Sequence, residues 1–325
     1  MPRDPAAARY RETTSISRRV AVEVQRIWRT LTASRIEIDL EGAAGRRILD
    51  LVVAGQLSVA AGAQRYVAET VAASRQTATA GLAAVAGLLQ PRAFAGAASD
   101  GRPLATLLYV PAITVASRRA AGASDEEAML AGLFQMTRFV STQIADASRA
   151  STQVAMVANP AVTMYARVVN LPACARCIVL AGRTYRTDFK FERHPACDCE
   201  MKSVTEDEWR QMQTPQQIFD GMSPEQQRRV FGVDGSEAIR MGADINQVVN
   251  ARRGMESPGD ATTTEGSTVR SYYAHRLRAA GGDIERGTGR YGTVTTPRLT
   301  PEGIFARTTD RDEQLALLRR YAYLT

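Results

Sequence analysis

Residues 174–199 read CARCIVLAGRTYRTDFKFERHPACDC and hold all four cysteines and one of the two histidines of a 325-residue chain. The side chains there that can bind a metal are Cys174, Cys177, His194, Cys197 and Cys199. Zinc in structural sites takes four thiolate or imidazole ligands in a tetrahedron, and a Cys-x2-Cys turn supplies two of them. Cys197 and Cys199 lie two residues apart, so on an extended segment both side chains face the same way. The spacing therefore predicts a structural zinc site.

Five candidate ligands for four positions leave the ligand set open. In an all-cysteine site His194 lies beside the metal and its N–H bonds to a sulfur, whereas in a Cys3His site it is itself a ligand. No position looks reserved for water, which favours a structural over a catalytic site. Two disulfides are disfavoured in a reducing cytoplasm, and a redox Cys-x2-Cys pair lacks the thioredoxin-like strand and helix pattern around it.

The residues around the cysteines predict a small α+β module. Residues 162–169, VTMYARVV, are β-branched and aromatic and predict a strand. The sixteen residues from 178 to 193 are long enough for a β-hairpin that returns the chain to the first cysteine pair. We expect Phe189 and Phe191 to fill the small core of that hairpin.

The N-terminal half reads as an elongated helical bundle. Its clearest apolar stripe has helical spacing and consists of Val20, Val24, Ile27, Trp28 and Leu31. Ser124 and Glu127 form a capping box that opens a helix running to about residue 154. This half contains neither cysteine nor histidine. We therefore expect it to serve docking and not chemistry.

The C-terminal part returns to short helices. Thr214-Pro215 and Ser223-Pro224 each place a capping residue before a proline at the first helical position. Residues 257–267, SPGDATTTEGS, are small and polar and predict a flexible linker. The chain is thus expected to be mainly α, with an N-terminal helical bundle, a small α+β Cys/His module and a helical C-terminal region. The expected segments are a docking domain 1–158, the Cys/His module 159–205, a short-helix region 206–256, the linker 257–267 and a C-terminal tail 268–325.

The charge of the chain indicates nucleic-acid binding only weakly. The chain has 41 Lys and Arg against 34 Asp and Glu, and all but Lys190 and Lys202 of the basic residues are arginine. Arginine suits phosphate, but a net charge of +7 is a mild attraction to polyanions, and a GC-rich genome also enriches arginine. Candidate nucleic-acid contacts in the Cys/His segment are Arg176, Arg183, Arg186, Lys190 and Arg193. A zinc-binding nucleic-acid module is therefore one alternative.

Membrane and enzyme functions are not indicated. The stretch 1–12 is polar, and the apolar stretch 104–116 is short and interrupted by Pro111, so we expect a protein without membrane segments that is made in a cytoplasm. We find no nucleophile and base pair and no glycine-rich phosphate loop between a strand and a helix. We therefore expect no enzymatic activity and no small-molecule substrate.

The Cys/His segment resembles the signature of MuF-like head morphogenesis proteins, the minor capsid proteins of tailed bacteriophages, and most closely versions from phages of actinobacteria. The matching residues are Arg167-Val168-Val169-Asn170, the two cysteine pairs, Leu180-Ala181-Gly182-Arg183-x-Tyr185 and Arg193-His194-Pro195. Stretches 243–255, 299–304 and 317–320 agree with the same group. The resemblance covers residues 162–325, whereas the helical half is generic.

The resemblance implies a structural protein of the virion that is present in the host cytoplasm during assembly. Such proteins join the head near the portal and assist head assembly, DNA packaging or delivery. The implied partners are the portal protein, the major capsid protein and packaged double-stranded DNA. Some relatives are fused to a protease or an ADP-ribosyltransferase toxin, so a toxin or protease joined to a MuF-like domain is a further alternative.

Overall fold

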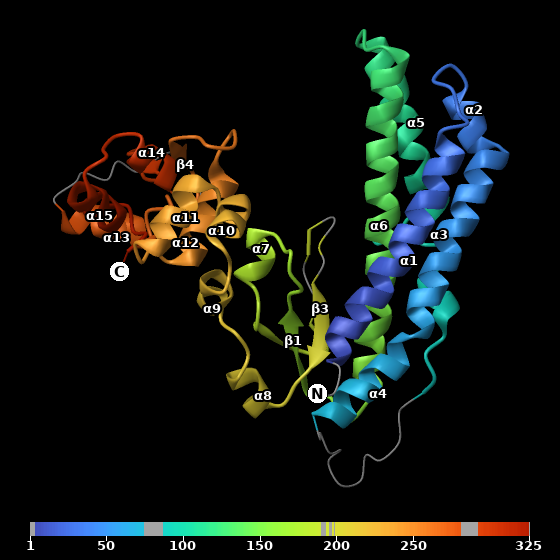
Figure 1. The fold of residues 1–325 in the computed structure, drawn as a ribbon, viewed down its shortest axis with the longest axis horizontal. Coiled ribbons are helices and arrows are strands. Elements are labelled where there is room, and N and C mark those ends of the chain that lie inside the picture. The colour runs from blue at the N-terminus through green and yellow to red at the C-terminus, as the bar shows by residue number, and fades with distance from the viewer. Residues whose placement is uncertain are drawn as a thin grey trace. The chain divides into compact units, whose positions relative to one another are not determined.

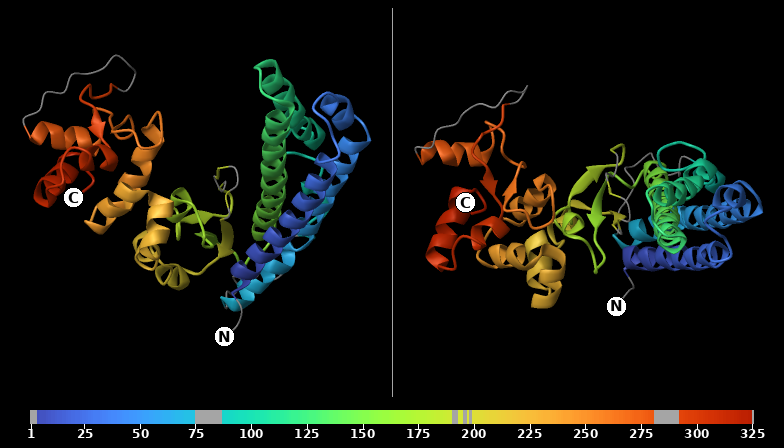
Figure 2. Two further views of the ribbon diagram at one scale, coloured as in Figure 1. Left: turned by 45° about the horizontal axis from the view of Figure 1, so that its top comes forward. Right: turned by 90° about the horizontal axis from the view of Figure 1, so that it is seen from above.

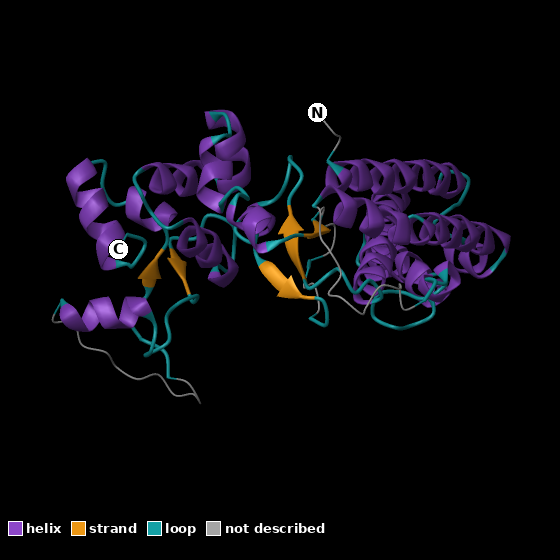
Figure 3. Ribbon diagram, turned by 90° about the horizontal axis from the view of Figure 1, so that it is seen from below, coloured by secondary structure: helices purple, strands orange, loops and turns teal. Residues whose placement is uncertain are grey.

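The computed structural model describes residues 4–74, 87–189, 193–194, 197, 199–280 and 292–324 (Figure 1). Helices predominate over short strands, as Figure 3 shows, so the expectation of a mainly α protein is confirmed. The chain forms two compact units. The first comprises residues 1–172 and 182–212, and the second comprises residues 173–181 and 213–325.

Long helices build most of the first unit and lie side by side (Figures 1 and 2). In chain order the helical elements before the sheet are α1 (Pro5–Trp28), α2 (Ile36–Glu41), α3 (Ala43–Ala61), α4 (Ala63–Ala73), the 3-10 turn Pro91–Phe94, α5 (Leu104–Ala120) and α6 (Asp125–Val157). Helix α6 packs against α1, α3, α4 and α5. It is therefore the central element of the bundle.

The predicted apolar stripe does face the bundle core. Val24 and Trp28 are buried, and Val20, Ile27 and Leu31 pack partly buried around them. The indole Nε1 of Trp28 donates to the carbonyl of Met129 at 3.2 Å, which satisfies its polar group inside the core. Gly132 lets α6 approach this ring closely.

The capping box at the start of α6 forms as the sequence predicts. The amide of Glu127 donates to Ser124 Oγ at 3.2 Å, and the amide of Ser124 donates to Glu127 Oε2 at 2.9 Å. These two bonds satisfy amides that would otherwise lack a partner at a helix start. The Ser124 amide, together with the Ser124 hydroxyl that donates to Glu127 Oε2 at 2.8 Å, lowers the pKa of the Glu127 carboxyl.

A three-stranded antiparallel sheet follows the bundle. Its strands are β1 (Met164–Val168), β2 (Thr184–Arg186) and β3 (Glu200–Ser203), in the order β2-β1-β3. The predicted strand is confirmed as β1, which lies in the middle. Tyr165 pairs with Tyr185 on one side, and Arg167 pairs with Met201 on the other. The first cysteine pair lies on the connection between β1 and β2.

The sheet packs on the bundle through buried side chains. Tyr66 and Met156 from the helices meet Tyr165 and Met201 from the sheet. The Tyr66 hydroxyl donates to the carbonyl of Met201 at 2.6 Å. Burial raises the pKa of Tyr66 well above its usual value, so the hydroxyl keeps its proton for this bond. The first unit thus joins bundle and sheet through one core.

The side chain of Phe189, which was expected to be buried, is exposed. The ring of Phe189 is 60% exposed, so the prediction that it fills the hairpin core is wrong. Its carbonyl accepts hydrogen bonds from Gln153 at 2.7 Å and from the Tyr165 hydroxyl at 3.1 Å. The backbone is therefore held inward while the ring points outward. Phe191 lies outside the described residues.

Short helices make up most of the second unit, whereas α8 (Glu206–Arg210) belongs to the first. The helices of the second unit are α7 (Ala175–Ile178), α9 (Pro215–Asp220), α10 (Pro224–Phe231), α11 (Val233–Arg240), α12 (Ile245–Ala251), α13 (Tyr272–Ala279), α14 (Pro301–Phe305) and α15 (Arg311–Arg320), with a 3-10 turn at Arg252–Gly254. The caps predicted at Thr214 and Ser223 are both formed.

The stretch 257–267 differs from the flexible linker that its composition predicts. Thr262–Thr263 form β4, which pairs antiparallel with β5 (Arg298–Leu299). The buried hydroxyl of Thr263 donates to the carbonyl of Ala251 at 2.6 Å. Local composition cannot predict pairing with a strand 35 residues away. A polar stretch can therefore form ordered structure that its own residues do not indicate.

Replacing Gly132 with alanine should destabilise the first unit. Alanine is normally better than glycine inside a helix by about 1 kcal/mol. Here the new Cβ would lie 2.7 Å from Trp28 Cζ2 and 2.6 Å from Val115 Cγ2. We expect a loss of about 1–3 kcal/mol in the free energy of unfolding, measured by urea titration. Both tryptophans of the chain, Trp28 and Trp209, lie in this unit and report by fluorescence.

The double variant G132A/V115A is the matched control, because it removes one of the two clashing groups. It should be more stable than expected from the sum of the two single changes. A G132A protein more stable than the parent would contradict the packing described for α6.

Candidate metal centre

The first cysteine pair lies at the start of α7. Cys174 is the residue before the helix, and the amide of Cys177 donates to its carbonyl at 3.0 Å. The two sulfur atoms are 3.5 Å apart. Zinc–sulfur bonds of about 2.3 Å in a tetrahedron separate the sulfurs by about 3.8 Å. The spacing of the pair therefore suits two ligands of one ion.

Gly182 lies in the turn that leads from the first cysteine pair into β2. Its φ of +72° lies in the left-handed region that favours glycine. The Gly182 amide donates to the carbonyl of Arg167 at 3.0 Å, and the Arg167 amide donates to the carbonyl of Arg183 at 3.0 Å. Strand β1 thus anchors the chain where it leaves the first pair.

The second cysteine pair is held by α6. Cys197 and Cys199 are both buried and lie just before β3. The guanidinium of Arg149 donates to the carbonyl of Cys199 at 3.0 Å, and its other branch donates to the carbonyl of Cys197. Arg149 also pairs with Asp146 at 3.3 Å, one turn earlier on α6. The backbone of the second pair is therefore fixed by one buried side chain.

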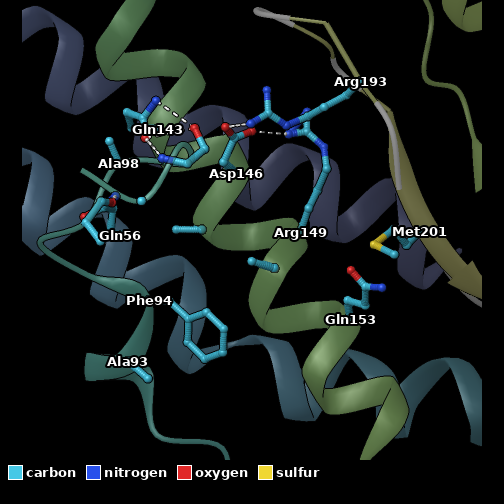
Figure 4. A pocket seen from close by; sticks show the side chains of 15 residues that line it. Gln56, Ala93, Phe94, Ala98, Gln143, Asp146, Arg149, Gln153, Arg193 and Met201 are labelled. Carbon is cyan, nitrogen blue, oxygen red and sulfur yellow. Dashed lines mark hydrogen bonds and ion pairs between the residues drawn. The ribbon is translucent and has the colours of Figure 1, made fainter. Parts of the chain in front are cut away.

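Figure 4 shows that the carboxylate of Asp146 faces two guanidinium groups, those of Arg149 and Arg193, and pairs with both. Arg193 directly precedes His194. Burial lowers the pKa of Arg193, and the nearby Cys197 opposes that shift. Asp146 therefore ties the start of the returning chain to α6.

All five predicted ligands take part in close groups. The ligand atoms of Cys177, Cys197 and Cys199 lie within 4.8 Å of one another, and those of Cys174, Cys177 and His194 do the same. Cys177 belongs to both groups. The cluster could hold a metal ion, and the choice between an all-cysteine and a Cys3His set stays open.

A buried arginine faces the sulfur atoms. Arg167 on β1 is 1% exposed, and its guanidinium donates to the sulfur of Cys197 at 3.5 Å. Burial by itself would lower the pKa of Arg167, but the charges of Cys199 and Cys197 and their hydrogen bonds raise it above its usual value. Thiolates carry the charge that this cation offsets, and hydrogen bonds to sulfur tune a metal–thiolate site. The surroundings therefore fit deprotonated cysteines.

The sequence did not point to Asp146 or Arg149, and it placed Arg167 in the signature without indicating its contact with the sulfurs. The helical half was expected to serve docking alone, yet α6 supplies two of these residues. A signal does exist: Asp146 and Arg149 are three residues apart in a stretch of Ala, Ser and Thr, on a helix side that is otherwise buried. A buried charge needs a partner, but the sequence does not show which distant segment provides it.

Two of the candidate nucleic-acid residues have carboxylate partners among the described residues. Arg186 makes two bonds to Asp188, at 3.1 and 3.0 Å, and Arg193 pairs with Asp146. Arg183 lies 5.9 Å from the centre of the Tyr185 ring, and Arg176 is exposed on α7. Lys190 lies outside the described residues. Carboxylates therefore balance two of these charges.

A cavity of about 470 Å³ lies in the first unit beside Asp146 and Arg149 (Figure 4). Two of its buried polar residues hold the loop before α5. Gln56 accepts from the amide of Gly96 at 2.9 Å, and Gln143 accepts from the amide of Ser99 at 2.8 Å. Contacts within the chain thus account for these polar side chains.

Residues 1–226 match the family model described as VG15 protein, and the chain belongs to this family. Membership indicates a phage-related protein. The match includes the helical bundle, which the sequence resemblance left generic, and the whole Cys/His segment. No curated protein and no solved structure matches the chain. Among the helices of the described residues, none is long and apolar enough to cross a membrane.

The first prediction for this centre concerns metal content. Protein purified under reducing conditions should contain one zinc ion per chain by elemental analysis. Cys177→Ser should remove it, because Cys177 belongs to both groups of ligand atoms. Hydrogen exchange should then speed up in β1 to β3 while the helices persist by circular dichroism.

Replacing the other histidine, His275→Ala, is the control and should keep the metal. Freshly reduced parent protein without any bound metal would contradict the assignment.

The second prediction concerns Arg149. Arg149→Met leaves two carbonyls and Asp146 without their buried partner, so we expect a loss of about 3 kcal/mol in the free energy of unfolding. Amide exchange should speed up most at residues 200–203. Arg149→Lys should not restore stability, because an ammonium lacks the planar fork. Arg18→Met, at an exposed position on α1, is the control and should change stability by less than about 0.5 kcal/mol. Equal stability of the two methionine variants would refute the role of Arg149.

Proposed function

We propose that the chain is a structural minor head protein of a tailed bacteriophage, with a MuF-like Cys/His module. The observation that carries this proposal is the close approach of Cys174, Cys177, His194, Cys197 and Cys199, the residues on which the MuF-like resemblance depends. A resemblance of sequence letters alone would not require these five residues to lie together. Membership in a phage-related family supports the same conclusion.

Zinc is the metal that fits the donors best. The ligands are sulfur and imidazole, and three of the four sulfurs are on buried residues. Thiolate and imidazole ligands favour zinc over magnesium or calcium. A closed set of such ligands serves structure and leaves no open position for a substrate. One ion would cross-link the two cysteine pairs of residues 174–199 and stabilise a segment with little apolar core of its own.

The proposed partners follow from the resemblance. They are the portal protein, the major capsid protein or both, together with packaged double-stranded DNA, in the virion and in the host cytoplasm during assembly. A role in head assembly, packaging or delivery needs no catalytic residues, and we propose that the chain has no enzymatic activity.

The alternatives receive less support. In a zinc-binding nucleic-acid module the arginines near the metal would face phosphate, but Arg186 and Arg193 pair with Asp188 and Asp146. A toxin or protease joined to a MuF-like domain stays a prediction, to be tested by activity assays on the full chain.

Purified virions of the phage that encodes the chain test the proposal. Mass spectrometry should detect the chain in mature particles, and a nonsense mutation early in its gene should lower the yield of infectious particles. A plasmid copy of the parent gene should restore the yield, whereas a Cys177→Ser copy should not. Absence of the chain from both mature particles and assembly intermediates would refute a structural role in the head.

A further inference from the structure

The N-terminal part of α6 carries an unusual exposed stripe. Leu130 and Phe134, four residues apart, are 65% and 75% exposed. Large apolar side chains at that exposure and spacing are typical of a surface that contacts another protein. Both residues line a groove of about 520 Å³ between α5 and α6. The buried side of the same helix is occupied, since Ala128, Gly132 and Met136 lie against the bundle core.

Charged residues continue the stripe at both ends with the same spacing. Glu126 stands four residues before Leu130, and Arg138 stands four residues after Phe134. Both side chains are exposed, and neither forms an ion pair within the part of the chain that the structure describes. Their neighbours differ: Asp125 pairs with Arg119 at 2.6 Å, and Glu127 is bonded to Ser124 in the capping box.

The stripe is self-complementary about its midpoint. A two-fold axis that passes between Leu130 and Phe134 on the exposed side of α6, at the height of residue 132, brings Leu130 opposite Phe134 of a second copy and Glu126 opposite Arg138. Rows of residues spaced by four form ridges, and two helices that pack through such ridges cross at about 50°. A two-fold interface of this kind uses the same patch on both subunits. Each copy therefore supplies the anion, the cation and both apolar groups that the other needs.

We propose that this stripe, formed by Glu126, Leu130, Phe134 and Arg138, is a homodimer interface in which α6 of two copies pack antiparallel across a two-fold axis. The apolar pair supplies the contact, and the two symmetry-related Glu126–Arg138 pairs set the antiparallel direction. A stripe of two apolar residues per copy makes a small interface. We therefore expect a weak dimer that dissociates on dilution. The inference stands apart from the proposed head function, because it concerns the isolated chain.

Charge reversal provides the sharpest test, using the full chain and analytical ultracentrifugation over a concentration series. The parent protein should form a dimer. Phe134→Ser should raise the dissociation constant by about tenfold or more. Glu126→Arg alone and Arg138→Glu alone should each raise it by about fivefold, because each places like charges opposite one another twice. An equimolar mixture of these two variants should form a heterodimer with near-parental affinity, since every facing pair is again opposite in charge.

The controls separate folding from association. Arg18→Glu makes the same charge change on the exposed face of α1 and should leave the dimer unchanged. Circular dichroism should show that all variants keep the helical content of the parent. A parent protein that stays monomeric at the highest concentration would overturn the proposal. So would a dimer that resists Phe134→Ser, or single charge variants that weaken the dimer but fail to recover when mixed.

Discussion

The buried guanidinium of Arg149 holds the backbone of the second cysteine pair on the helical bundle. It binds the carbonyls of Cys197 and Cys199 and the carboxylate of Asp146 at once. A buried cation must have its donors satisfied or it costs several kcal/mol. The planar fork of arginine allows few arrangements that satisfy all of its donors. The backbone of the second cysteine pair is therefore tied to α6 whatever ion the sulfurs hold.

Local patterns account for much of the fold and for the ligands of the candidate centre. Capping boxes, the strand 164–168 and the cysteine spacing all depend on residues close in sequence, and the structure has each of them. The supporting residues could not be predicted in the same way. Arg149 meets residues about fifty positions later in the chain, and nothing in its own helix shows what it will contact. The pairing of Thr262–Thr263 with Arg298–Leu299 was missed for the same reason.

Phe189 shows a different limit of sequence reasoning. An aromatic residue between strands suggests a core position, because burying a large ring is favourable. Here the ring is exposed, and the carbonyl of Phe189 accepts hydrogen bonds from Gln153 and Tyr165. Hydrogen bonds to a backbone carbonyl can fix a residue in a position from which its side chain cannot reach the core. A hydropathy pattern reflects the gain from burying a side chain but contains no information about backbone hydrogen bonds.

Helix α6 sets the distance between two separate features of the molecule. It runs without interruption over 33 residues, about 50 Å, and carries both the stripe at Glu126–Arg138 and the side chains of Asp146 and Arg149. Because an α-helix rises about 1.5 Å per residue, Arg149 lies about 16 Å along the axis from Arg138. The side chain that fixes the second cysteine pair and the exposed stripe therefore share one continuous backbone, and their spacing is determined by helix geometry.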